Sequence, residues 1–294
     1  MTQRDSDVLS RFVFERTNVR GELVHLDATW RAILERRDYP VPVRELLGQA
    51  MAAAALLVTT IKFNGSLILQ IQGDGPVSLI VVQVKSDRTL RGLAHWTDPV
   101  LAGPLAQLVG KARLAITIDQ GGDRERYQGI VALETEEHLA HAFRDYFERS
   151  EQLATRLWLA ASDTRAAGML LQTLPGETED ADAWNRVVQL AATLTEQELL
   201  ELPQRDVLRR LFHEEDVRVF EPEPVSFRCT CTRERIEAVL RSLGYDEVQG
   251  IIAEQGRVSV DCEFCNQNYT FDPVDVEKLF AASAHQPTVP PTRH

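Results

Sequence analysis

Four cysteines are the residues of this 294-residue chain whose types and spacing could do chemistry. They form two close pairs, Cys229 with Cys231 and Cys262 with Cys265, with 30 residues between the pairs. Four thiolates can complete a tetrahedron around zinc, and the close spacing lets one short turn present two sulfurs at once. Four protein sulfurs also leave no coordination position open for water or substrate. The spacing therefore predicts one zinc ion, bound by all four cysteines and not catalytic.

The same sulfurs could also respond to oxidants. A disulfide within the pair Cys229 and Cys231 is feasible, but it cannot form while both sulfurs hold a metal ion. Oxidation, metal loss and unfolding would then be one coupled event. The alternative is a purely structural zinc ribbon, which spacing alone favours. The chemistry permits a switch and leaves both interpretations open.

The position of the cysteines indicates the redox compartment. All four lie in the last quarter of the chain, whereas the disulfides of a secreted fold would tie distant segments together. Clustered cysteines in a reducing cytosol more often hold metal or sense oxidants. Residues 1–14 contain no uninterrupted hydrophobic segment of signal-peptide length. We therefore expect a cytoplasmic protein.

Composition argues against two classes of partner. The net charge of -12 would repel a phosphate backbone, so we expect no nucleic-acid partner. The longest apolar-rich run, residues 50–61, falls short of the ~20 residues needed to cross a bilayer. We expect it to be a buried helix and expect no membrane partner.

The sequence contains no convincing catalytic motif. Gly73 and Gly75 resemble the start of a dinucleotide-binding motif, but strand-like residues follow where a helix is needed, which favours a hairpin turn. His138 and His141 share a helix face without an HExxH pattern, so solvated side chains are favoured over metal ligands. With no nucleophile elbow or phosphate loop either, we expect no enzyme, no catalytic residues and no cofactor site beyond the zinc.

The elements around the cysteines predict a C-terminal four-cysteine zinc-binding domain at residues 225–294, which would be a redox-switch domain if its sulfurs respond to oxidants. Thr232 and Asp246 can each cap a helix between the two pairs, and Asp272 can begin a last one. A small hairpin should flank the second pair, where Asn266 can adopt a left-handed turn. A module this small has little core of its own, so metal binding would supply much of its folding free energy.

The pattern of residues 1–175 predicts that they form an N-terminal α+β core. Strands and helices alternate irregularly along it, which is typical of an α+β domain. Asp27 can cap a first helix, an Ala-rich and Leu-rich helix follows at 43–63, and an amphipathic one at 136–149. The expected strands are 12–14, 22–26, 66–72, 77–84, 112–119, 125–131, 155–161 and 167–174.

Residues 176–224 predict a metastable helical linker. Its three short helical patterns are 183–194, 196–202 and 206–213, and Thr195 with Glu198 forms a capping-box pattern. Helices this short are marginal alone and need tertiary contacts. Four apolar residues of the first pattern could bind a client or pack on a neighbouring domain, and packing is favoured. They are Trp184, Val187, Val188 and Leu190.

Several stretches resemble the redox-regulated heat-shock protein 33 family, also called the 33 kDa chaperonin. The resemblance spans nearly the whole chain, and two positions depart from it: Ala112 and Asn266 stand where glycine is expected. The stretches are RGELVHLDATW from Arg20, GDGP from Gly73, AITIDQGG from Ala115, RERYQGIV from Arg124, SEQLATRLWLA from Ser150, LFHEEDVRVFEP from Leu211, and the cysteine stretches CTCTRERI and CEFCN.

The resemblance implies a redox-activated holding chaperone. Reduced protein would hold zinc through all four cysteines and be inactive, and peroxide or hypochlorous acid would pair Cys229 with Cys231 and Cys262 with Cys265. Zinc would then leave, the C-terminal domain and the linker would unfold, and the protein would bind unfolding client proteins without ATP. It would also dimerise when oxidised. The alternative from another class is a zinc-ribbon adaptor that binds a protein partner through a permanently reduced module.

Overall fold

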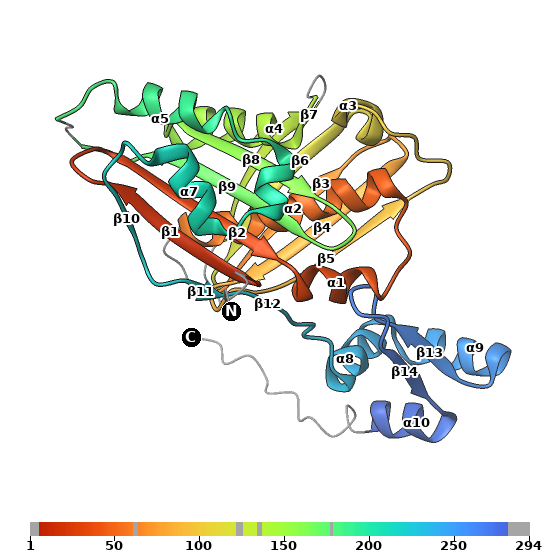
Figure 1. Cartoon of the computed structure of the whole chain (residues 1–294). Coiled ribbons are helices and arrows are strands. Elements are labelled where there is room, and N and C mark those ends of the chain that lie inside the picture. The colour runs from red at the N-terminus through yellow and green to blue at the C-terminus, as the bar shows by residue number, and fades with distance from the viewer. Residues whose placement is uncertain (1–5, 61–63, 122–125, 134–136, 177–178, 282–294) are drawn as a thin grey trace, which may run out of the picture. The chain divides into compact units, whose positions relative to one another are not determined.

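The structure is a computed structural model that describes residues 6–60, 64–121, 126–133, 137–176 and 179–281. The chain divides into two compact units, Met1–Arg228 and Cys229–His294 (Figure 1). All four cysteines belong to the second unit. The predicted three-part division, with residues 176–224 as a separate linker, stays a prediction.

The first unit contains two six-stranded sheets. In the first sheet the strand order is β10-β1-β2-β9-β8, and β11 also pairs with β1. Its strands are β1 (Val8–Phe14), β2 (Val19–Leu26), β8 (Thr155–Ala161), β9 (Ala166–Thr173), β10 (Val217–Val219) and β11 (Glu223–Pro224). All the pairings in this sheet are antiparallel.

The second sheet has the order β12-β5-β4-β3-β6-β7. It consists of β3 (Ser66–Gln72), β4 (Val77–Lys85), β5 (Thr89–Trp96), β6 (Ala112–Asp119), β7 (Tyr127–Leu133) and β12 (Ser226–Phe227). The GDGP residues connect β3 to β4, which confirms the predicted hairpin turn. A side chain cannot be added at Gly75, because its Cβ would lie 2.5 Å from the backbone nitrogen of Gly110.

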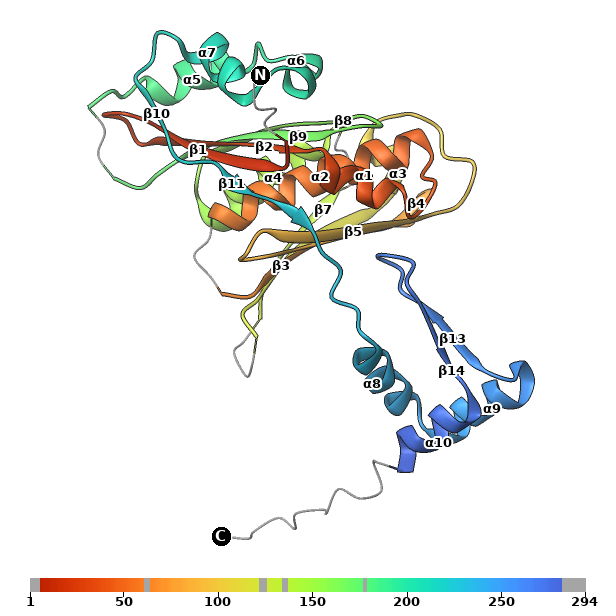
Figure 2. The same cartoon turned by 60° about the horizontal axis from the view of Figure 1, so that its bottom comes forward.

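The helix α2 (Val41–Thr60) lies between the two sheets (Figure 2). Its apolar residues are buried on nearly all sides, as its composition predicts. Among the described residues it is the one helix long and apolar enough to cross a membrane, but 72% of that window is buried inside the protein. The other helices of this layer are α1 (Ala28–Leu34), α3 (Leu105–Val109) and α4 (Leu139–Tyr146), which continues as the π-helix η1 (Phe147–Glu151).

Three short helices cover the other face of the first sheet (Figure 2). They are α5 (Ala183–Ala191), α6 (Glu196–Glu201) and α7 (Gln204–Phe212). The predicted capping box of Thr195 and Glu198 is present at the start of α6. Val187 is fully buried, and Trp184 and Leu190 pack against the same apolar cluster, which confirms the packing interpretation for these three residues.

The second unit is built from three helices and one hairpin. These elements are α8 (Arg233–Leu243), α9 (Tyr245–Gln255), β13 (Val258–Asp261), β14 (Asn268–Phe271) and α10 (Pro273–Ala281). Its core is small, and its buried residues are Leu240, Val248, Val258, Phe271, Val276 and Leu279. The α+β fold class is therefore confirmed for the chain as a whole.

Two predicted helix caps are wrong. Asp27 precedes α1 but its side chain does not cap the helix, because the buried carboxylate accepts a hydrogen bond of 2.8 Å from Arg165. The carboxylate of Asp7 instead accepts hydrogen bonds of 2.8 to 3.1 Å from amides at the start of α1. Asp246 lies inside the first turn of α9, whose N-cap is Gly244.

Other predicted bounds differ by a few residues, and β5 and the short strands β10, β11 and β12 were not predicted. The predictions 43–63, 125–131 and 136–149 extend into residues 61–63, 125 and 136, which lie outside the described part of the chain. β5 was not predicted, because Arg91 and Gly92 interrupt its apolar pattern. Its place between β4 and β12 depends on pairing with neighbouring strands.

Candidate metal centre

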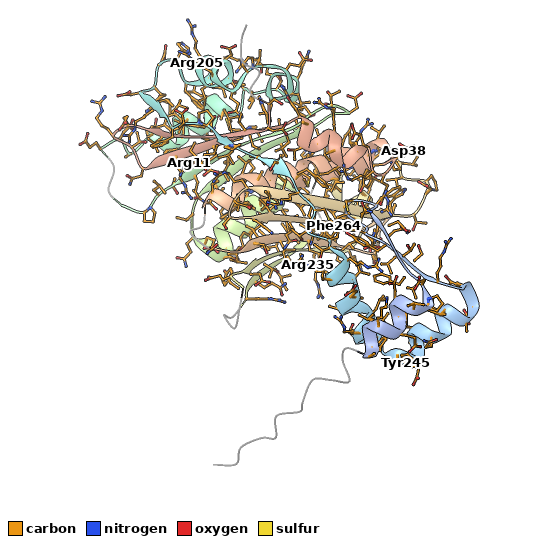
Figure 3. All side chains as sticks on the ribbon, turned by 90° about the horizontal axis from the view of Figure 1, so that it is seen from below. Arg11, Asp38, Arg205, Arg235, Tyr245 and Phe264 are labelled. Carbon is orange, nitrogen blue, oxygen red and sulfur yellow. The ribbon has the colours of Figure 1, made fainter. Side chains whose placement is uncertain are left out.

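The first cysteine pair lies in a short loop between β12 and α8. Thr232 caps α8, and its hydroxyl accepts a hydrogen bond of 3.4 Å from the backbone amide of Arg235. The guanidinium of Arg235, labelled in Figure 3, donates to the carbonyl of Thr230 at 2.9 Å and to its hydroxyl at 2.8 Å. These bonds anchor the loop on both sides of Cys231.

The second pair lies in a tight turn between β13 and β14. The amide of Asn266 donates to the carbonyl of Cys262 at 2.7 Å, and the amide of Cys265 donates to the same carbonyl at 3.2 Å. The amide of Cys262 donates to the carbonyl of Gln267 at 3.0 Å, which closes the turn. Asn266 has a φ of 55°, so the predicted left-handed conformation is confirmed.

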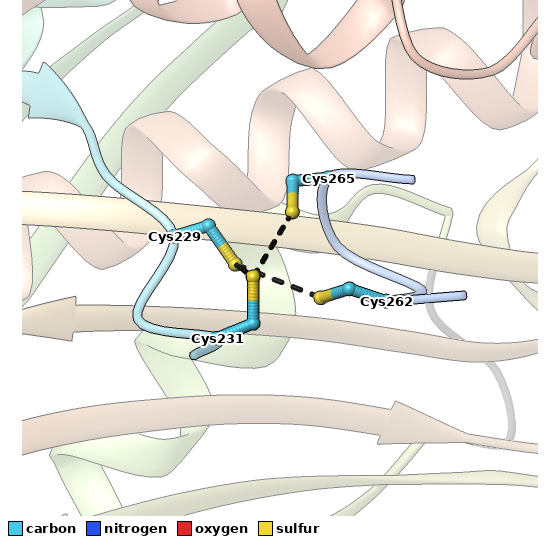
Figure 4. Close-up of side chains that lie close together, drawn as sticks. All are labelled: Cys229, Cys231, Cys262 and Cys265. Atoms are coloured by element: carbon cyan, nitrogen blue, oxygen red, sulfur yellow. Dashed lines mark hydrogen bonds between the residues drawn. The ribbon is translucent and has the colours of Figure 1, made fainter. Parts of the chain in front are cut away.

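The four sulfur atoms converge on one point, and all lie within 4.8 Å of one another (Figure 4). The sulfur of Cys231 lies 3.4 Å from that of Cys229 and 3.3 Å from that of Cys265, and 3.6 Å separates Cys229 from Cys262. Tetrahedral zinc with bonds of ~2.3 Å needs sulfur atoms ~3.8 Å apart. The arrangement and the all-sulfur donor set therefore fit one metal ion.

The cysteines form no disulfide, and they are half-buried except for the buried Cys262. Burial raises the pKa of the Cys262 thiol and the pKa of the Cys265 thiol above the ordinary value. Without a cation the cluster therefore favours neutral thiols, whereas a bound metal ion would favour thiolates. Metal binding at this site would release protons.

Tyr269 also belongs to the site, although no motif in the sequence singles it out. Its hydroxyl donates a hydrogen bond of 3.3 Å to the sulfur of Cys231, and this bond raises the pKa of Tyr269 to about 12. The sequence offered one signal, an aromatic residue four positions after Cys265 in a strand. It could not show that the hydroxyl reaches the other cysteine pair.

The two histidines of the predicted helix face, His138 and His141, lie next to each other. The rings of His138 and His141 lie 5.4 Å apart, edge to face. Within the described ranges, the four cysteines form the one group of three or more His, Cys, Asp or Glu residues close enough to hold an ion.

The fold and the cysteine site together define a class: an α+β protein that carries a four-cysteine module able to hold a metal ion. A family model described as Hsp33 protein matches residues 7–272. The chain belongs to the Hsp33 family, and it is a chaperone.

Individual relatives agree with this assignment over the full length. The chain is 53% identical to a 33 kDa chaperonin of Nitrosococcus oceani, over 100% of both chains. It is 44% identical to a 33 kDa chaperonin of Methylobacillus flagellatus, over 96% of this chain and 97% of the relative. The crystal structure of a 33 kDa chaperonin from Thermotoga maritima has the same fold, with a TM-score of 0.83 and 24% identity, over 95% of this chain and 100% of that one.

Proposed function

We propose that this chain is a redox-regulated holding chaperone that works without ATP. Its reduced form would hold one zinc ion through Cys229, Cys231, Cys262 and Cys265 and would be inactive. The observation that carries the proposal is the convergence of these four sulfurs within 4.8 Å, in a member of a chaperone family. A bound zinc ion would join the two cysteine pairs and keep their sulfurs as thiolates.

Oxidation would convert the thiols into the disulfides Cys229–Cys231 and Cys262–Cys265, the pairing that the family resemblance implies. One sulfur attacks the peroxide oxygen and becomes a sulfenic acid while hydroxide leaves, and the second sulfur displaces the remaining hydroxyl group. Formation of each disulfide transfers two electrons from the two sulfurs to one peroxide molecule. The sulfurs of Cys231 and Cys265 are also close, at 3.3 Å, so mapping the disulfides is a direct test of the pairing.

Loss of the metal would unfold the second unit because its own core is small. Six residues form its buried cluster, and Phe271 and Leu240 are among them with at most 2% exposure. A core of this size contributes little folding free energy without a metal or disulfide crosslink. Disulfides within each pair close only very short loops, so they would not replace the link between the pairs.

Detachment of the three helices α5 to α7 would expose the proposed client-binding surface. They cover apolar residues of the first sheet, among them Phe12, Phe14 and Leu23, each at most 2% exposed. The chain after α7 pairs with β1 through β10 and β11 and with β5 through β12, and Cys229 follows β12 by two residues. Unfolding that begins at Cys229 would therefore loosen the strands that hold this segment in place.

The remaining features of the proposal concern partners and location. Unfolding client proteins are the partners, and the oxidised form would be a homodimer in the cytoplasm. The net charge of -12 supports the absence of a nucleic-acid partner, and the burial of α2 supports the absence of a membrane partner. We propose no enzymatic activity, because the four-sulfur site offers no open coordination position.

The experiment measures zinc content and client aggregation by light scattering, before and after peroxide with mild heat. We expect one zinc ion per reduced chain, its release on oxidation, and suppression of aggregation only afterwards. Cys262→Ser should abolish reversible switching, whereas Glu263→Gln in the same turn keeps every sulfur and should switch normally. Oxidation that merely inactivates the protein would favour the zinc-ribbon adaptor. A Cys262→Ser variant that still toggles would overturn the role of Cys262.

A further inference from the structure

We propose that Tyr269 is a positioning residue that restrains the reactivity of Cys231 toward oxidants. The inference rests on the proposed function and extends it, because Tyr269 is not one of the four sulfur ligands. Its hydroxyl donates a hydrogen bond of 3.3 Å to the Cys231 sulfur. The tyrosine therefore contacts the reacting atom of the first cysteine pair from the segment that carries the second pair.

The hairpin holds this hydroxyl in place. Tyr269 lies opposite Val260 in the pairing of β13 with β14, and its half-buried ring packs against the small core of the second unit. Phe271, two positions further along the strand, points to the same side and is 1% exposed. The packed ring leaves the hydroxyl little freedom, so the hydrogen bond is a fixed part of the site.

The donor to Cys231 differs from those of the second pair. Backbone amides of Phe264 and Cys265 donate to the sulfur of Cys262, and the amide of Gln267 donates to the sulfur of Cys265. Those donors remain whatever side chain is substituted. The donor from Tyr269 can be deleted by removing one oxygen atom, which makes Cys231 the sulfur whose surroundings can be changed alone.

A hydrogen bond to a thiolate withdraws electron density from the sulfur and makes it a weaker nucleophile. Within the pair Cys229 and Cys231, attack of the Cys231 sulfur on peroxide would break the O–O bond and release hydroxide. Cys229 then attacks the oxidised sulfur, the S–S bond forms and the second hydroxide leaves. The Tyr269 hydroxyl opposes the first of these steps, so its loss should accelerate oxidation.

The experiment compares Tyr269→Phe with Tyr245→Phe in the full-length chain loaded with zinc. Tyr245 is a matched control, because its hydroxyl donates to Glu277 at 2.7 Å and it lies away from the cysteine turn that carries Phe264 (Figure 3). A chelating dye follows metal release after peroxide is added. We expect release from Tyr269→Phe to be roughly tenfold faster than from the wild type, and no change in Tyr245→Phe.

A second readout isolates the electronic effect from a structural one. In the cobalt-loaded proteins, the sulfur-to-metal charge-transfer band should move to lower energy in Tyr269→Phe alone, because a sulfur without the hydrogen bond is richer in electrons. An unchanged band, or a release rate equal to that of the control, overturns the role of Tyr269 while zinc release from the wild type upholds the proposed function. A wild type that binds no metal overturns both.

Discussion

Glu22 is an unusual ionisable residue outside the cysteine cluster, since its side chain projects from β2 and is almost fully buried. Thr59, in the last turn of α2, donates a hydrogen bond to it. Burial raises the pKa of Glu22 from 4.5 to about 7, although Arg20 and Arg11 nearby oppose the shift. The carboxyl group therefore changes charge near neutral pH inside the core.

This shift predicts how stability depends on pH. Between pH 4.5 and about 7 the folded state binds more protons at Glu22 than the unfolded state, so the free energy of unfolding falls as pH rises. The contribution is fully present below pH 4.5 and lost above about pH 7. Glu22→Gln should remove this dependence and be more stable than the wild type at pH 8, by at most about 3 kcal/mol.

Urea unfolding of the first unit at pH 5 and at pH 8 measures this effect. Glu45→Gln is the matched control, because Glu45 lies on α2, the helix that carries Thr59, but is exposed. It should leave the dependence on pH unchanged. A wild-type protein as stable at pH 8 as the Glu22→Gln variant would contradict the assigned pKa shift.

At the scale of elements, we propose that the short helices over the first sheet are the weak point of the reduced fold. Thr195 accepts a hydrogen bond of 3.2 Å from the amide of Glu198 and donates one of 3.0 Å to its carboxylate. Leu199 in the same helix is 1% exposed and packs into the cluster beneath. The capping box therefore stabilises the helix that holds this apolar contact.

Thr195→Ala should weaken α6 by about 1 kcal/mol, because it removes the N-cap hydroxyl. We expect faster hydrogen exchange in α6 and α7, and client holding at a lower peroxide concentration or temperature than in the wild type. Gln197→Ala is the control, since the Gln197 side chain is exposed and bonds only to Glu201 within the helix. Equal behaviour of the two variants would argue against α6 as part of the switch.

The strands show which elements could be predicted from the sequence. β6 and β8 have the predicted bounds, because alternating apolar residues between turn signals define a strand locally. β10, β11 and β12 are two or three residues long and were not predicted, because they exist only through pairing with β1 and β5. Asp27 shows the same limit, since its side chain bonds to Arg165, distant in sequence.

At the scale of the whole molecule, the two units have separate cores. The first unit contains the large cluster around α2 and the cluster under α5 to α7, whereas the second unit has only its own small cluster. A chelator should therefore unfold the second unit and leave the sheets around α2 folded.

Hydrogen exchange with mass spectrometry, before and after complete chelation, tests this expectation. Amides in α8 to α10 should lose protection, while those in α2 and β3 keep theirs. Protection retained in the second unit after chelation would contradict the proposed dependence of its fold on a metal. Loss of protection throughout both units would contradict their independence.

The amino-acid sequence by itself determined which four residues could bind a metal, the elements that carry them and the α+β class, because these depend on spacing and local periodicity. Tertiary structure alone decided that the four sulfurs meet within 4.8 Å, that Tyr269 bonds to Cys231, and that α5 to α7 cover an apolar sheet face. Contacts between residues far apart in sequence depend on how the elements pack, and no local pattern encodes that packing.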